Sequence, residues 1–83
     1  LVNQVTKPQT VITCALDIAS KICQGAPIAA MYAKETIING MDMTLAQGLK
    51  IEADLSILLQ STLDRKEGLQ SFIEKRLPRF TGA

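Results

Sequence analysis

Hydrophobic residues recur every three or four positions along most of the chain, the spacing of one face of an α-helix. Between residues 8 and 23 polar residues occupy the opposite side, so this stretch predicts a helix with one packed face. Pro8 is tolerated in a first turn, Thr6 is a candidate cap, and Gly25 ends the helix. Its apolar positions are Val11, Ile12, Ala15, Leu16, Ile18, Ala19 and Ile22.

A second helix is predicted from Pro27, since proline is favoured in a first helical turn. Asn39-Gly40 is a left-handed C-cap signature and marks its end. The connection between the first two helices is short, which is typical of helices that are antiparallel neighbours.

A third helix is predicted from Thr44 to about Gln60. Thr44 and Gln47 have the spacing of a capping box, in which two side chains satisfy backbone amides at a helix start. This helix is apolar nearly all round, and such a helix must be covered on every side. Because the other helices are short and few, we expect a partner outside these residues to cover it.

A fourth helix is predicted after Ser61-Thr62, ending at Leu77-Pro78 because a residue before proline disfavours the helical conformation. Its expected inward residues are Leu69, Phe72 and Ile73. Gly48 and Gly68 lie inside the third and fourth helices, where each costs about 1 kcal/mol relative to alanine. We expect another backbone to approach each of them closely. The fold class is therefore all-α, with about four helices.

The charge balance and residue types exclude several kinds of site. A formal charge of +1 leaves no overall footprint for nucleic acid, and no apolar run is long enough for a membrane span or a secretory leader. Without histidine, neither a zinc site nor a histidine-based triad is expected. Cys14 and Cys23 lie roughly 13 Å apart on one helix, too far for a disulfide, and indicate free thiols in a reducing compartment.

Residues 64–80 resemble the D-x-x-E-G-x-x-x-F-x-E-K-R-x-P-x-F signature that closes chains of the enoyl-CoA hydratase/isomerase (crotonase) superfamily. The matching residues are Asp64, Glu67, Gly68, Phe72, Glu74, Lys75, Arg76, Pro78 and Phe80. Residues 26–29, 33–34, 38–39 and 45–52 also resemble consecutive stretches of that family. The resemblance extends over residues 1–83.

This resemblance implies the C-terminal helical part of an α/β spiral fold, with oligomerisation and coenzyme A (CoA) capping as its roles. Leu1-Val2 is similar to the end of the family's G-L-V, so we expect the spiral core, its oxyanion-binding amides and its catalytic carboxylates to lie upstream. No catalytic residue is therefore assigned here, including the glutamates Glu35, Glu52, Glu67 and Glu74. No cofactor is implied, since CoA is part of the substrate.

The implied parent protein hydrates or isomerises an enoyl-CoA and forms a homotrimer or hexamer. Among the branches of the superfamily, the sequence around Ile38-Asn39-Gly40-Met41 most resembles the methylglutaconyl-CoA hydratase-like branch. The resemblance implies the mitochondrial matrix in a eukaryote or the cytoplasm in a bacterium, without nucleic-acid or membrane partners. The alternative is a non-catalytic helical interaction module derived from the same fold.

The resemblance also places two CoA contacts, with Phe72 stacking on the adenine and Lys75 pairing with the ribose phosphate. Their spacing of three would bring ring and ammonium together on one helix face. The alternative is that Phe72 is a core residue and that Lys75 complements the helix dipole. Arg76 is expected to pair with an acid such as Glu52 or Glu67. Tyr32, with three methionines, either lines an acyl pocket or belongs to the core.

Overall fold

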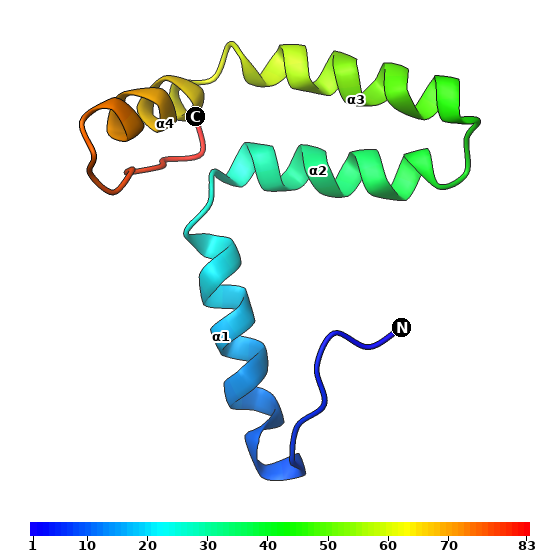
Figure 1. Cartoon of the computed structure of the whole chain (residues 1–83), viewed down its shortest axis with the longest axis vertical. Helices are drawn as coiled ribbons and strands as arrows, with labels where there is room; N and C mark the ends of the chain where they lie inside the picture. Colours follow the sequence, from blue (N-terminus) through cyan, green and yellow to red (C-terminus); the bar gives the residue numbers. More distant parts are fainter.

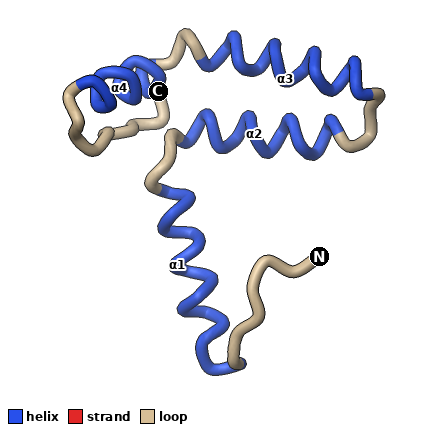
Figure 2. Tube along the Cα trace, in the orientation of Figure 1, coloured by secondary structure: helices blue, strands red, loops and turns tan.

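The computed structural model describes residues 1–83 and contains helices without any strand (Figure 1; Figure 2). A short 3-10 helix at Pro8–Thr10 leads into α1 (Val11–Cys23), followed by α2 (Pro27–Gly40), α3 (Leu45–Leu59) and α4 (Leu63–Ile73). The all-α class and the number of helices predicted from periodicity are confirmed.

The helix starts follow local side-chain chemistry. In the capping box of α3, Thr44 Oγ1 accepts from the Gln47 amide at 3.3 Å, and Gln47 Oε1 accepts from the Thr44 amide at 3.2 Å. Thr62 likewise accepts from the Arg65 amide at 3.1 Å and starts α4. The prediction of Thr6 as a cap is wrong, because the 3-10 helix begins after Lys7 and makes no side-chain capping bond.

Two helix ends differ from those predicted. Gly40 is still helical, and the C-cap of α2 is Met41 in a right-handed conformation (φ −66°), so the predicted left-handed cap is wrong. α4 ends at Ile73 rather than at Leu77-Pro78. It ends early because Lys75 adopts a left-handed conformation, φ +54°, which no α-helix continues through.

The end of α4 is a Schellman motif, the turn in which two amides beyond a helix satisfy carbonyls of its last turn. The Lys75 amide donates to the Phe72 carbonyl at 3.2 Å and the Arg76 amide donates to the Ser71 carbonyl at 3.0 Å. Glycine is the usual residue at the left-handed position of this motif, and here it is a lysine.

The helices form a single open layer. α2 and α3 run antiparallel side by side, and α4 lies near the start of α2 (Figure 1). α1 turns away from α2 with a bend of 108°, so the expectation that these two helices are antiparallel neighbours is wrong. The molecule measures 43 × 40 × 18 Å and has a radius of gyration of 16.0 Å. A compact domain of this length would have a radius of about 12 Å. The chain therefore spreads out in one layer instead of folding around a centre.

No hydrophobic residue of the chain is buried. The accessible surface is 7111 Å², whereas a compact protein of this mass exposes about 4,900 Å². The predicted packed face of α1 has no partner within residues 1–83, since Leu16 is 62% exposed and Ile22 60%. The prediction that Leu69, Phe72 and Ile73 point inward is wrong within residues 1–83. Leu69 is 50% exposed, Phe72 83% and Ile73 78%.

The two interior glycines make different contacts. A Cβ at Gly48 would lie 3.8 Å from the Gly40 backbone, so α2 and α3 approach closely at this point, as predicted. A Cβ at Gly68 would meet the ring of Phe80 at 3.6 Å instead. The expected backbone approach at Gly68 is therefore wrong, and its neighbour is an aromatic side chain.

The cysteines are unpaired, as predicted: Cys14 is partly exposed and Cys23 is exposed. None of the helices alone has the length and the apolar content of a membrane-spanning helix. Residues 8–23 and 27–40 reach that length and apolar content only when taken together, and they are bent by 108°.

Candidate functional site

A set of hydrogen bonds joins α4 to residues 74–83, which we call the tail. Asp64 is only 3% exposed, and its carboxylate accepts from the Thr81 amide at 2.7 Å, the Gly82 amide at 2.8 Å and the Thr81 hydroxyl at 3.3 Å. The Asp64 amide donates to the Ala83 carbonyl at 2.9 Å. One acidic residue at the start of α4 thereby holds the last three residues of the tail.

One turn further along α4, Glu67 holds the first half of the tail. Its carboxylate binds Arg76 in a two-pronged pair, with Oε1 to Nη1 at 2.6 Å and Oε2 to Nη2 at 3.0 Å. Oε1 also accepts from the Arg79 amide at 2.8 Å. Arg76 Nε reaches Glu74 at 2.5 Å. We call these contacts of Asp64 and Glu67 with the tail the tail clasp.

Arg76 changes the acidity of the two glutamates that it contacts, Glu67 and Glu74. Hydrogen bonds from Arg76, and then from the Arg79 amide, lower the pKa of Glu67 to about 2 from its usual value near 4.5. Hydrogen bonds from Arg76 and Gln70 lower the pKa of Glu74, and the two glutamates together raise the pKa of Arg76. These groups therefore stay charged near neutral pH and act as structural ions.

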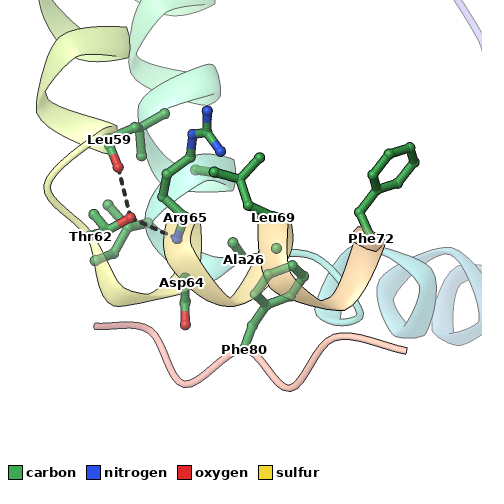
Figure 3. A pocket seen from close by; sticks show the side chains of 11 residues that line it. Ala26, Leu59, Thr62, Asp64, Arg65, Leu69, Phe72 and Phe80 are labelled. Atoms are coloured by element: carbon green, nitrogen blue, oxygen red, sulfur yellow. Dashed lines mark hydrogen bonds between the residues drawn. The ribbon is translucent and has the colours of Figure 1, made fainter. Parts of the chain in front are cut away.

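An apolar cavity of about 400 Å³ lies beside the tail clasp, between the start of α2, the end of α3 and α4. Figure 3 shows Phe80 of the tail below α4, whereas Phe72 projects away from the other labelled side chains. The Phe80 ring lies next to Gly68, so the tail clasp places an aromatic wall against the cavity. The cavity is lined by Ala26, Ile28, Ala29, Leu59, Thr62, Asp64, Arg65, Gly68, Leu69, Phe72 and Phe80.

The two predicted CoA contacts lie at the end of α4 and are both exposed. Phe72 is in the last turn of the helix, but Lys75 lies beyond it in the left-handed turn. Phe72 and Lys75 are therefore not three positions apart on one continuous helix, and the predicted placement of their side chains on one helix face is wrong. Their binding of CoA stays a prediction.

The predicted pairing of Arg76 with an acid is confirmed for Glu67 and not for Glu52. Sequence reasoning missed the part played by Asp64, although Asp64 belongs to the motif that carries the family resemblance. A carboxylate repeated one helical turn before Glu67 was the available signal, since both side chains then share one helix face. What the sequence could not reveal is that the tail folds back along that face.

Tyr32 and the methionines do not gather at one place. Tyr32 lines a cavity of about 340 Å³ between α2 and α3, and Met41 lines a different one. Met31 is 58% exposed and Met41 81%, so neither is a core residue within this chain. The structure brings together no acyl pocket from these four residues, and no group of three or more metal-binding side chains.

The helices and their order are those of a helical segment of the crotonase fold. The family model for enoyl-CoA hydratase/isomerase matches residues 1–83, and the chain belongs to this family. It is similar to an enoyl-CoA hydratase of Bacillus anthracis, with a TM-score of 0.90 and 40% identity over 95% of this chain and 31% of that one. A Geobacillus kaustophilus enoyl-CoA hydratase matches with a TM-score of 0.92 and 33% identity over 99% of this chain and 32% of the enzyme.

Two relatives known from their sequences are also named as hydratases of CoA thioesters. Mitochondrial enoyl-CoA hydratase of Pongo abelii is 39% identical over 96% of this chain and 28% of its own length. Mitochondrial methylglutaconyl-CoA hydratase of Mus musculus is 44% identical over 82% of this chain and 22% of its own length. The chain thus spans under a third of the length of these relatives.

Proposed function

We propose that residues 1–83 are the C-terminal helical segment of an enoyl-CoA hydratase or isomerase acting on acyl-CoA thioesters. The observation that carries this proposal is the match of nearly the whole chain to a part of solved hydratases, at TM-scores of 0.90 and 0.92. The methylglutaconyl-CoA hydratase relative supports methylglutaconyl-CoA as one candidate substrate. Mitochondrial and bacterial relatives support the matrix or the cytoplasm as the compartment.

The open layer supports a role in covering the rest of the fold and in oligomer assembly. The surface exceeds that of a compact protein of equal mass by roughly 2,200 Å². An excess of this size is comparable with the area buried in obligate protein–protein interfaces. We propose that the enzyme's core covers part of the layer and that neighbouring subunits of a trimer or hexamer cover another part.

The chemistry belongs to the remainder of the proposed enzyme. Hydration of an enoyl-CoA requires donors for the thioester oxyanion and a carboxylate that moves a proton. The carboxylates of the tail clasp are committed to arginine and to backbone amides, so we assign them no proton transfer.

Within this segment, we assign CoA binding to Lys75 and Phe72. Lys75 keeps a long cationic side chain at a left-handed position where glycine is favoured. Such outliers concentrate at functional sites, because a selected role offsets the conformational cost. The exposed Phe72 ring has an apolar face free to stack on a base. The ribose phosphate is the partner proposed for the Lys75 ammonium.

The experiment that tests this proposal is steady-state kinetics of the complete polypeptide on enoyl-CoA substrates. Loss of an exposed phosphate–ammonium pair is worth about 1 kcal/mol or less, so Lys75→Ala should raise KM several-fold with kcat nearly unchanged. Dephospho-CoA substrates should be almost unaffected, since they lack the phosphate.

Equal loss on intact and dephospho substrates would assign Lys75 to a subunit contact or the helix end instead. Absence of turnover on every enoyl-CoA tested would favour the non-catalytic interaction module.

A further inference from the structure

The turn that carries Lys75 is fixed from both of its flanks. Glu74 before it and Arg76 after it are joined by the 2.5 Å contact between Glu74 Oε2 and Arg76 Nε. Arg76 is in turn bound to Glu67 through both terminal nitrogens, at 2.6 and 3.0 Å. All three guanidinium nitrogens are thus used, and the orientation of this side chain is defined.

Glu67 also reaches past the turn. It accepts from the Arg79 amide at 2.8 Å, so one carboxylate on α4 holds the chain at two points after Lys75. The pair is more shielded than the ion pairs elsewhere, with 24% of the Glu67 side chain exposed, against 62% for Asp17 in its pair with Lys21. A two-pronged arginine–carboxylate pair fixes direction as well as distance.

Lys75 itself has no such anchor. Its side chain makes no hydrogen bond or ion pair, and a left-handed backbone is unfavourable for a residue with a Cβ. Such a conformation persists where the surrounding structure determines it. Here the turn is held by the two Schellman bonds of the Lys75 and Arg76 amides, and beside them by the contacts of Glu67 and Glu74 with Arg76.

We infer that Glu67 is a positioning residue for CoA recognition: through Arg76 it holds the turn that directs Lys75 at the ribose phosphate. This inference rests on the proposed function of Lys75. Glu67 touches no substrate and moves no proton. Its effect on binding passes through the conformation of the turn.

The test compares Glu67→Gln and Arg76→Lys in the complete polypeptide, with intact and dephospho enoyl-CoA substrates. Glutamine leaves an acceptor for the Arg79 amide but removes the charged pair, and lysine keeps the charge but loses the two-pronged geometry. Each should raise KM about two- to fivefold for the intact substrate only, with kcat unchanged. Asp54→Asn, which removes the exposed pair with Lys50 on α3, should leave both KM values unchanged.

The double variant Glu67→Gln/Lys75→Ala separates positioning from a general structural effect. If Glu67 acts through Lys75, the double variant should discriminate between the two substrates no differently from Lys75→Ala alone. A selective Lys75→Ala effect with no selective effect of Glu67→Gln or Arg76→Lys overturns the positioning role only. A Lys75→Ala variant without selectivity overturns the proposed phosphate contact and the positioning role together.

Discussion

The layer made by α1, α2 and α3 and the tail clasp on α4 are held together by opposite means. The layer is regular and apolar, yet none of its hydrophobic residues is buried. The tail has little regular structure, yet α4, to which the tail clasp fastens it, contains the two buried residues of the chain, Asp64 and Ser71. Ser71 donates to the Gly68 carbonyl at 3.0 Å, so both are hydrogen-bonded.

The difference shows where each region's stability comes from. Apolar helices gain stability only when another surface covers them. Charged hydrogen bonds between Asp64 or Glu67 and the tail are satisfied within residues 63–83. We therefore expect the layer to depend on a partner, and the tail clasp to depend mainly on its own residues.

The largest expected effect concerns the layer. The isolated 83-residue chain should self-associate or unfold without a cooperative transition, because its exposed apolar surface has no cover. Sedimentation velocity and thermal melting measure this directly. A monodisperse monomer with a cooperative transition at high temperature would show that the layer needs no partner.

A large effect is also expected inside the tail clasp. Asp64→Ala leaves three donors without their acceptor and should destabilise the clasp by about 2–4 kcal/mol. Hydrogen exchange at the Thr81 and Gly82 amides of the complete polypeptide should then accelerate on the order of a hundredfold. The matched variant Asp17→Ala removes an exposed pair and should leave these amides unchanged. Unchanged exchange in Asp64→Ala would mean that other contacts hold the tail.

A smaller effect should come from the left-handed turn. Lys75→Gly removes the Cβ at a position with φ +54° and should raise the free energy of unfolding by about 1 kcal/mol or less. Denaturant unfolding of the complete polypeptide would measure it, with Lys66→Gly in the middle of α4 as the control expected to destabilise. Destabilisation by both substitutions would argue against a left-handed Lys75.

The smallest expected effect is the pH dependence of the pair between Glu67 and Arg76 in the tail clasp. Because the pKa of Glu67 is lowered to about 2, its stabilising contribution is complete above pH 4.5 and is lost as the pH falls through about 2. NMR titration of the Glu67 carboxyl carbon in the complete polypeptide would follow this change. Glu67→Gln should lack the transition, and a midpoint near 4.5 in the unaltered protein would contradict the pair with Arg76.

Periodicity and capping chemistry were sufficient to predict the helices. The capping box at Thr44 and the proline at the start of α2 act within a few residues, so a sequence displays them directly. The end of α4 was predicted wrongly because Lys75 carries no local sign of a left-handed conformation. Besides its two Schellman bonds, the turn is flanked by the pair of Arg76 with Glu67, a contact between residues nine positions apart.

The site was harder to predict than the fold for the same reason. The sequence suggested that Arg76 pairs with Glu52 or Glu67. Choosing between these two acids requires the path of the tail, which the sequence does not show. The bonds from Thr81 and Gly82 to Asp64 join residues 17 and 18 positions apart. Helical spacing extends along α4 and says nothing of contacts made after the helix has ended.

The antiparallel pair α2 and α3 also has a consequence for the order of folding. Its contacts are local in sequence, since only residues 41–44 separate the two helices. Helices form in roughly 0.1–1 μs, and short connections close faster still. Local contacts speed folding, so this pair should form early, while any docking onto a distant surface waits for slower closure of a longer chain. For that interval its apolar residues are open to solvent, and binding by chaperones would compete with docking.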